Sequence, residues 1–226
     1  MPTDGLININ GDSVQTLEIL FLTTMIALLP SLLVMMTSFT RYIISLSFLR
    51  TAMGTQQTPP NTVLVGIALF LTLLTMNPVI ERIGTEAWEP YREQEITQEE
   101  FIDRALVPMK EFMLQNTKPE TLRMYCNLAH VDIPEDNAGL DEVAMDLSLR
   151  VVVPAFMTQE LQKGFYIGLL LYLPFLLLDV VVASTLMSMG MVMLPPAMIS
   201  TPFKLLLFIS VNGWTQLFSG LVQSVI

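Results

Sequence analysis

The chain has 226 residues, of which 52% are hydrophobic and only 14% are charged, and its formal net charge is −10. A soluble domain carries about 25% charged residues, so a soluble globular enzyme is disfavoured, and disorder is excluded because it requires low hydrophobicity and high charge. The charge is concentrated in one stretch, since 17 of the 21 acidic and eight of the 11 basic residues lie between Glu81 and Lys163. Nucleic-acid binding is excluded as well, because there is no basic stripe to neutralise phosphate.

Residues 1–16 form a polar N-terminal segment with acidic side chains at Asp4 and Asp12. The segment lacks the basic stretch and the small-residue cleavage site that are typical of a secretory signal peptide. We therefore expect the first apolar segment itself to direct membrane insertion.

Long charge-free runs on both sides of the charged middle predict membrane-associated helices. They occupy 19–40, 51–80, 164–178, 180–203 and 205–226. Because a bilayer span needs about 20 apolar helical residues, we predict four long apolar helices, at roughly 17–50, 62–80, 160–187 and 197–223. The first is long enough to be two helices joined near Pro30.

The segment 37–50 carries a polar stripe that does not suit contact with lipid. At the helical period of about 3.6 residues, its polar side chains share one side of the helix and mainly apolar side chains share the other. The polar members are Thr37, Ser38, Thr40, Arg41, Ser45 and Ser47. Prolines and glycines also interrupt the apolar segments, and lipid offers no partners for the backbone groups that they free. Both features indicate burial against another helix or a wet cavity.

The sequence contains an internal echo. Met53-Gly54, four residues and Pro59-Pro60 recur as Met189-Gly190, four residues and Pro195-Pro196, each time between two apolar helices. Either this is coincidence, or it marks the tips of two similar hairpins, formed by Gly54, Pro59, Pro60 and by Gly190, Pro195, Pro196. We expect an all-α fold of two long apolar helical hairpins, 17–80 and 160–226, separated by a small acidic helical domain, 81–159.

The middle domain carries helix-start signals. Thr97 with Glu100, and Thr117 with Glu120, match the capping box that begins a helix. Pro119 fits a first helical turn, where its missing N–H has little effect. Residues 151–154 read Val-Val-Val-Pro and are typical of a short extended stretch before the next helix.

Basic residues predict the orientation, because Lys and Arg favour cytoplasmic loops. Arg41 and Arg50 flank the first short loop, and Lys204 follows the second. This pattern predicts an extracytoplasmic middle domain, with both termini on the same side of the membrane as that domain.

Enzyme chemistry finds no support in the sequence. The single histidine, His130, lies in the polar middle, so a His-Glu-x-x-His helix and an intramembrane Ser–His pair are both excluded, and phosphate-binding glycine motifs are absent. Cys126 lies four residues before His130 and could share a helix face with it. We expect a packing pair there rather than a metal site, since no third ligand is in view. We expect neither catalysis nor a cofactor.

Asp179 and Lys204 stand alone as ionisable residues in the second apolar half. Ionisable groups in apolar helices are costly and usually paired, so we expect these two to pair, either as a structural salt bridge or at a subunit interface or pathway. Arg41 and Arg50 are the corresponding charges of the first hairpin. We expect all four residues to be buried and assign them to assembly.

Methionines cluster around Gly190, at Met187, Met189, Met191, Met193 and Met198. Methionine fills irregular gaps in cores and also adapts to variable surfaces. The residues alone favour a gap-filling core, and the alternative is a soft collar that deforms around something passing through it. Gly164 and Gly168 form a G-x-x-x-G pair, a weak signal of a close helix contact.

Several longer motifs lie in order from residue 17 to the end of the chain. They are Met35-Met36-Thr37-Ser38-Phe39-Thr40-Arg41, Leu49-Arg50, Gly54-Thr55, Pro59-Pro60-Asn61, Glu111-Phe112-Met113-Leu114, Pro174-Phe175 with Asp179, Gly190 through Pro196, and Pro202-Phe203-Lys204 with Gly213-Trp214. In these motifs the chain resembles the FliP family of flagellar biosynthesis proteins. The injectisome family SctR shares the Thr-Ser-Phe-Thr and Pro-Pro-Asn elements, whereas the Glu-Phe-Met-Leu stretch favours the flagellar family.

The resemblance implies a non-enzymatic pore subunit of the flagellar type III protein export gate. Members of the family assemble in several copies with FliQ and FliR, and work with FlhB and FlhA at the flagellar basal body in the bacterial inner membrane. Unfolded flagellar proteins pass through the assembly. The family's methionine-rich constriction falls on Met191, Val192 and Met193 here, and the central valine departs from the usual methionine run. We expect the collar to be slightly stiffer for that reason.

Three alternatives remain open at this point. An injectisome export subunit is the alternative within the same class. An ion or solute transporter would use Asp179 as its coupling group and would move solute when reconstituted alone. An extracytoplasmic sensor or scaffold would bind its partner through residues 81–160, but this reading explains neither the polar stripe nor the methionine loop.

Overall fold

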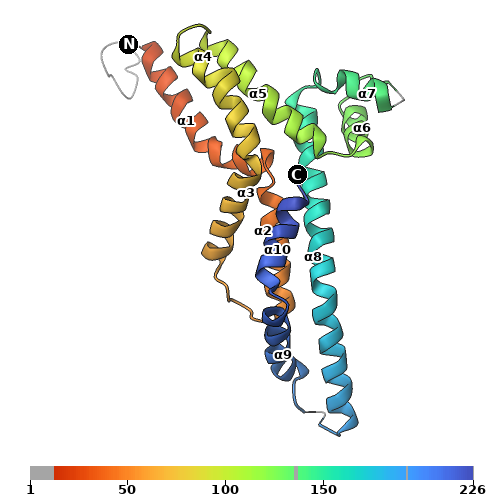
Figure 1. The fold of residues 1–226 in the computed structure, drawn as a ribbon. Helices are drawn as coiled ribbons and strands as arrows, with labels where there is room; N and C mark the ends of the chain where they lie inside the picture. Colours follow the sequence, from red (N-terminus) through yellow and green to blue (C-terminus); the bar gives the residue numbers. More distant parts are fainter. Residues whose placement is uncertain (1–12, 135–136, 192, 226) are drawn as a thin grey trace, which may run out of the picture. The chain divides into compact units, whose positions relative to one another are not determined.

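The computed structural model describes residues 13–134, 137–191 and 193–225, and every regular element within these ranges is a helix (Figure 1). The all-α prediction is confirmed. In chain order the elements are α1 (Ser13–Met36), α2 (Phe39–Met53), α3 (Asn61–Ile83), the π-helix η1 (Gly84–Trp88), α4 (Glu89–Arg92), α5 (Gln98–Gln115), α6 (Pro119–Leu128), α7 (Asn137–Ala144), α8 (Leu149–Ser188), α9 (Pro196–Ser210) and α10 (Gly213–Gln223).

Helix α1 belongs to a unit of its own, which comprises Met1–Met35. Within it, the hydroxyl groups of Thr23 and Thr24 donate to the carbonyl oxygens four residues earlier, at 2.6 and 2.7 Å. These hydroxyls are therefore satisfied inside the helix, as an apolar environment requires. Most of the polar segment predicted at 1–16 lies outside the described residues.

The predicted break near Pro30 was wrong. Pro30 lies inside α1, and the helix ends instead at Met36, before Thr37 and Ser38. There the Thr37 hydroxyl accepts from the backbone N–H of Phe39 at 3.4 Å, and the Ser38 hydroxyl lies 3.0 Å from the Thr75 hydroxyl on α3. Short hydroxyl side chains compete with the helix for backbone partners, so they end α1 where proline does not.

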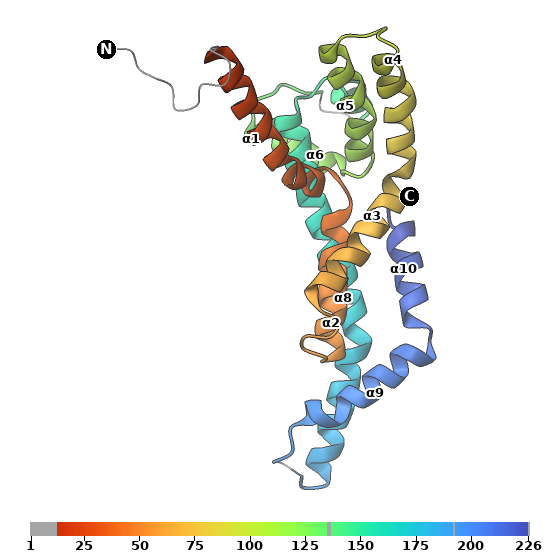
Figure 2. The same cartoon turned by 90° about the vertical axis from the view of Figure 1, so that its left-hand side faces the viewer.

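In the second unit, Met36–Ile226, α2 packs along α8 (Figure 2). Two glycines on α8 make this approach possible. A Cβ atom at Gly164 would lie 3.2 Å from Cβ of Ile44, and one at Gly168 would lie 2.6 Å from Cγ of Phe48. The Gly164–Gly168 pair therefore marks a close helix contact, as the sequence predicted.

The second unit has two buried hydrophobic clusters. One joins α2, α3, α8, α9 and α10, and contains Tyr42, Leu46, Leu64, Phe175, Phe208 and Leu221 among others. The other joins the end of α3 and the N-terminal part of α8 to α5, α6 and α7, and contains Met113, Cys126, Leu140, Val152 and Phe156 among others. The predicted domain limits at 80/81 and 159/160 both fall inside helices, α3 and α8, which run without interruption from the apolar hairpins into the acidic middle.

The predictions for the middle segment met different outcomes. The capping box of Thr97 and Glu100 is confirmed, with Glu100 N–H 3.3 Å from the Thr97 hydroxyl and Thr97 N–H 2.9 Å from Glu100 Oε2. Pro119 lies at the start of α6 as predicted, but the second capping box was wrong. Lys118 is the N-cap, and the Thr117 hydroxyl donates instead to the Met113 carbonyl at 2.7 Å, within the preceding helix end.

The extended stretch predicted at 151–154 was also wrong, because α8 already begins at Leu149. Val151 and Val152 are buried in the cluster around Phe156. Burial of an apolar helix face outweighs the weak preference of valine for strands.

Cys126 and His130 do not share a helix face. Helix α6 ends at Leu128, and His130 is exposed with φ 54°, whereas Cys126 is fully buried. Among the residues that the structure describes, no three His, Cys, Asp or Glu side chains lie close enough to hold a metal ion. Burial raises the pKa of the Cys126 thiol, with Arg123 opposing the shift, so the reactive thiolate is disfavoured.

We therefore expect Cys126 of the native protein to react with a maleimide on the order of 100-fold more slowly than the unfolded chain, because reaction requires local opening. The measurement is the labelling rate at pH 7 with and without denaturant. The control is a Cys126→Ser, Ser148→Cys variant, whose new thiol replaces an exposed side chain. Equal native rates for the two proteins would contradict the burial of Cys126.

Candidate functional site

Both copies of the internal echo form loops between helices. Gly54 and Gly190 are left-handed, with φ 74° and 76°, and each donates its N–H to the carbonyl three residues earlier, at 3.1 and 3.0 Å. This conformation favours glycine because it lacks a Cβ atom. Pro60 and Pro195 are the N-caps of the helices that follow. The shared geometry supports two similar helix–loop–helix tips. They differ by one residue, since the N-cap is the second proline of the first pair and the first proline of the second pair.

Arg50 belongs to the first tip. Its Nη1 atom donates to Asn61 Oδ1 at 2.5 Å and to the Pro59 carbonyl at 3.3 Å. The side chain is half-buried. The prediction that it is buried was therefore wrong. Within the chain, Arg50 therefore closes the loop between α2 and α3.

The methionine cluster lies at the second tip and is exposed. Met193 is 100% exposed, and Met187, Met189 and Met198 are each 66–69% exposed. Met191 is 40% exposed, and Val192 lies outside the described residues. The gap-filling core that the residues alone favoured was therefore wrong for this chain by itself, since these side chains contribute to neither buried cluster.

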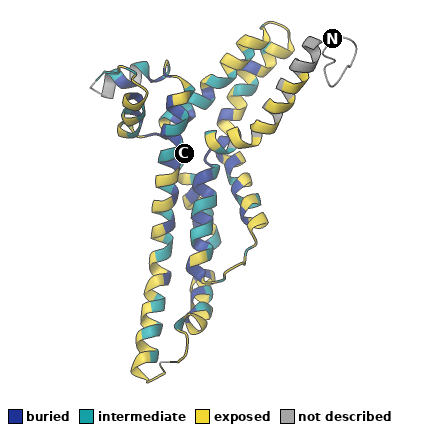
Figure 3. Ribbon diagram, turned by 180° about the vertical axis from the view of Figure 1, so that it is seen from behind, coloured by how far each residue is buried: buried dark blue, intermediate teal, exposed yellow. Residues whose placement is uncertain are grey.

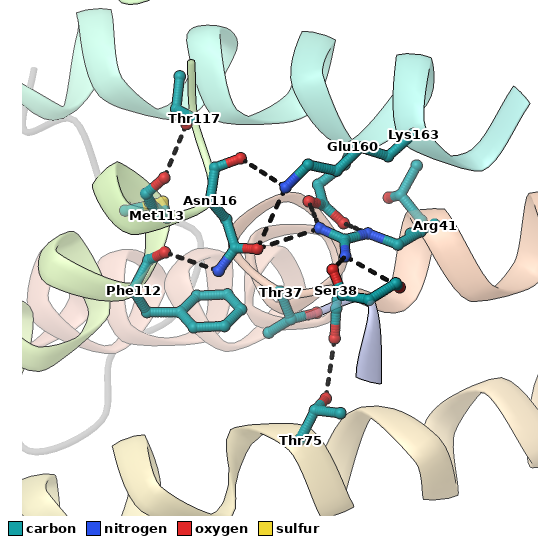
Figure 4. A network of polar contacts seen from close by, with 12 residues as sticks. Thr37, Ser38, Arg41, Thr75, Phe112, Met113, Asn116, Thr117, Glu160 and Lys163 are labelled. Carbon is teal, nitrogen blue, oxygen red and sulfur yellow. Dashed lines mark hydrogen bonds and ion pairs between the residues drawn. The ribbon is translucent and has the colours of Figure 1, made fainter. Parts of the chain in front are cut away.

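Arg41 is the centre of the polar stripe predicted at 37–50, and it faces α8 and the end of α5 (Figure 4). Arg41 is fully buried, and so is Glu160 on α8. The guanidinium binds both carboxylate oxygens of Glu160, with Nε 2.9 Å from Oε2 and Nη2 in contact with Oε1. Such a two-point pair is strong and directional.

The remaining guanidinium donors bind residues from two other parts of the chain. Nη2 donates to Asn116 Oδ1 at 3.1 Å, and Nη1 donates to the backbone carbonyl and the hydroxyl of Ser224 after α10. Lys163 Nζ donates to the Asn116 carbonyl at 3.0 Å. Figure 4 shows Asn116 bound to both of these cations. One buried network thus joins α2, the α5–α6 connection, α8 and the end of α10.

Glu160, Asn116 and Ser224 were not recognised from the sequence. Glu160 lies in a stretch with Lys163 at the edge of the charged middle, where a solvated charge is the usual expectation. The available signal was Arg41 itself, because a buried arginine requires an acidic partner.

The second ion pair is the one that the sequence predicted. Lys204 Nζ lies 2.6 Å from Asp179 Oδ2, and Lys204 is only 5% exposed. Ser200, one helical turn before Lys204, donates its hydroxyl to Asp179 Oδ1 at 2.6 Å. The pair therefore joins α8 to α9 within one chain.

An apolar cleft of about 620 Å³ lies between α8, α9 and α10. Its lining includes Phe175, Phe208 and Leu217, and its polar side chains are those of Gln216 and Ser224. No acid, base or thiol is among its lining residues, so the cleft offers the Ser224 hydroxyl no general base. That hydroxyl accepts from Arg41 Nη1 at 3.2 Å and donates to the Leu221 carbonyl at 2.6 Å.

Large apolar faces are exposed on α3, α8 and α9 (Figure 3). Members include Phe70, Leu74, Phe165, Leu177, Val181, Phe203 and Ile209. Within the described residues, two helices are long and apolar enough to cross a membrane, Asn61–Arg92 and Leu149–Ser188, and the number is up to four if each bent helix pair is one span. Soluble monomers rarely expose such faces. Asp179 is 33% exposed, so its predicted burial was wrong, and only Lys204 of that pair is buried. Fold and site together define a helical membrane protein with a buried Arg41–Glu160 pair and an exposed methionine tip.

The chain belongs to the FliP family, whose model matches residues 22–221. It is 46% identical over 214 residues to the flagellar biosynthetic protein FliP of Aquifex aeolicus, covering 95% of this chain and 87% of the relative. It is 49% identical over 212 residues to that of Pectobacterium carotovorum subsp. carotovorum, covering 94% and 78%. It is 46% identical over 210 residues to that of Bacillus subtilis, covering 93% and 92%. The resemblance seen in the motifs is confirmed.

Proposed function

We propose that this chain is a non-enzymatic pore subunit of the flagellar type III protein export gate. Several copies assemble with FliQ and FliR, next to FlhB and FlhA, and unfolded flagellar proteins pass through the assembly. The observation that carries this proposal is the methionine loop at the second tip, where Met193 is fully exposed and none of the described residues covers it. Family membership supports the flagellar setting.

The chemistry of methionine suits a seal that must deform. Its unbranched thioether side chain adopts many rotamers and packs against surfaces of different shape. A ring of Met191 and Met193 side chains from several copies would form an apolar constriction, which excludes ions by dewetting. In the sequence, Val192 stands between these two methionines, and its branched side chain is stiffer than theirs.

The apolar faces of α3, α8 and α9 support an assembly in the bacterial inner membrane, because neighbouring subunits or lipid must cover them. The positions of Arg41, Arg50 and Lys204 support an extracytoplasmic middle segment at 81–159. The buried Arg41–Glu160 pair supports a rigid protomer, and that is the role in assembly that we propose for Arg41. Lys204 joins α9 to α8 within the protomer, so we propose that its pair shapes the protomer that assembles rather than the contacts between copies.

The transporter alternative receives less support. Asp179 is already bound by Lys204 and by the Ser200 hydroxyl. A coupling carboxylate must release its partner in every cycle, and a pair tied at two oxygens resists that release. Reconstitution of the purified chain alone distinguishes the two, since only a transporter moves solute without partners.

The test of the proposed function is a Met191→Ala, Met193→Ala variant in the assembled export apparatus. We expect ion leak through the resting gate to rise severalfold, while flagellar protein export continues, because the seal loses its deformable side chains. Leak is measured as ion-dependent growth inhibition or conductance, and export as secreted flagellar protein. The matched control is Met124→Ala, which removes a half-exposed methionine from α6. Unchanged leak in the loop variant would remove the constriction from the account.

A further inference from the structure

A three-way polar contact ties α9 to both hairpins. Lys204 Nζ donates to Asp179 Oδ2 on α8 at 2.6 Å and also to the Ala52 backbone carbonyl near the end of α2, at 3.0 Å. Ser200 is fully buried and holds the other oxygen of Asp179. Thr201 lies against the first tip, since a Cβ atom at Gly54 would be 3.0 Å from its hydroxyl. We refer to Asp179, Ser200, Lys204 and the Ala52 carbonyl as the anchor.

Beyond the anchor, the described residues of the second hairpin contribute to neither buried cluster. None of the described residues between 180 and 199 is buried, and Figure 3 shows this end of α8 and the start of α9 as mostly exposed. The nine residues after Asp179, ending at Ser188, extend the helix by about 14 Å. A small rotation at the anchor therefore produces a large displacement of the methionine loop at 189–195.

We infer that Lys204 is a positioning residue for the methionine loop: it fixes the loop by holding α8 and α9 against the carbonyl end of α2. This inference rests on the proposed function of the loop. Lys204 does not line the constriction, and it acts through the helices that carry Met191 and Met193. A plain salt bridge needs only Asp179, whereas the bond to the Ala52 carbonyl sets the second hairpin relative to the first.

The Ala52 carbonyl is a hydrogen-bond acceptor, so the anchor needs a donor at position 204. Exchanging the two charges, Asp179→Lys with Lys204→Asp, restores an ion pair but places a carboxylate next to the Ala52 carbonyl, where two acceptors face each other. The exchange should therefore restore only part of the loop positioning that the single charge reversals lose. Lys204→Arg keeps both the charge and the donors, so it should keep most of the loop positioning.

The experiment compares Lys204→Met, Asp179→Asn and Lys204→Arg in the complete export apparatus, with Ser188→Ala as the control. Ser188 is exposed, lies on the same hairpin, and its hydroxyl donates only within its own helix, to the Thr185 carbonyl. Three quantities are measured: complex recovered by co-purification, ion leak through the resting gate, and secreted flagellar protein.

We expect Lys204→Met and Asp179→Asn to raise leak about fivefold, the population change that follows from loss of about 1 kcal/mol of positioning free energy. The complex should be recovered at the wild-type level, and Lys204→Arg and Ser188→Ala should stay near wild-type leak. The proposal is overturned if leak is unchanged in assembled complexes of both anchor variants. It is equally overturned if both variants fail to assemble, because the residue then supports the fold rather than the position of the loop.

The Met191→Ala, Met193→Ala variant separates this proposal from the proposed function. If the loop variant leaks and the anchor variants do not, the loop seals the pore but Lys204 does not position it. If the loop variant itself does not leak, the proposed function fails first.

Discussion

Replacing Glu160 by alanine should lower the free energy of unfolding by about 3–5 kcal/mol, because it leaves the Arg41 guanidinium charged, buried and without its carboxylate. For a chain of this size, that corresponds to a fall in melting temperature on the order of 10 °C. The measurement is thermal unfolding of the purified protein in detergent, together with the amount of assembled complex recovered. Arg41→Ala leaves the Glu160 carboxylate without its guanidinium. If Glu160 then finds another partner, we expect the recovery of the complex to fall less than the stability does.

The controls separate charge from packing. Arg41→Lys keeps the charge but cannot bind both carboxylate oxygens in a fork, so its effect should be intermediate. A double Arg41→Met, Glu160→Met variant removes both charges and should recover much of the stability, since apolar replacement of a buried pair is often neutral. A Glu160→Ala variant as stable as the wild type would contradict the burial of this pair.

Replacing Gly168 by alanine should destabilise the protein by about 1–3 kcal/mol, as expected for overpacking a tight contact. The new Cβ atom would lie 2.6 Å from Cγ and 2.9 Å from Cβ of Phe48, and a Cβ atom cannot move aside as a side-chain end can. Helices α2 and α8 must therefore separate. Gly168→Val should be worse, and the measurement is again thermal unfolding in detergent.

Gly66 on α3 provides the matched control. Apart from its chain neighbours and its own helix backbone, no atom lies within 4 Å of a Cβ built there, so Gly66→Ala should be neutral or stabilising by up to about 1 kcal/mol. Adding Phe48→Ala to Gly168→Ala should restore part of the lost stability, because it opens the space that the new methyl group needs. Equal effects of the two glycine substitutions would show that the α2–α8 contact is looser than described.

Much of this fold follows from local signals in the sequence. Charge-free runs predicted the long apolar helices α3 and α8, Thr97 with Glu100 predicted the start of α5, and two lone ionisable residues predicted the Asp179–Lys204 pair. Each of these signals depends on residues close in sequence or on a charge with few possible partners. The G-x-x-x-G pair, which is also a local signal, correctly predicted a close helix contact, since small residues on one helix face have few other uses. The single helix predicted at 197–223 was wrong, because the chain breaks between α9 and α10, where Asn212 is left-handed with φ 51° and the two helices meet at a 66° bend.

The failures came from contacts that only the folded chain creates. Pro30 is tolerated inside α1, whereas the hydroxyls of Thr37 and Ser38 end it. Val151 and Val152 are helical because a core covers them. The partners of Arg41 lie 75, 119 and 183 residues away in sequence, and no local pattern predicts such pairings. Composition also could not reveal that the methionines around Gly190 lie outside the core of their own chain.

The central claim is that the methionine loop faces the path of the exported protein, while the apolar helix faces contact neighbouring subunits or lipid. A photo-crosslinking residue at position 193, in an apparatus jammed with a flagellar substrate, tests this directly. The comparison is the same residue at position 70, which is 76% exposed on α3 in the single chain. The account predicts a crosslink to substrate from position 193 and none from position 70. Labelling of position 193 by a lipid-soluble probe, with no crosslink to substrate, would contradict it.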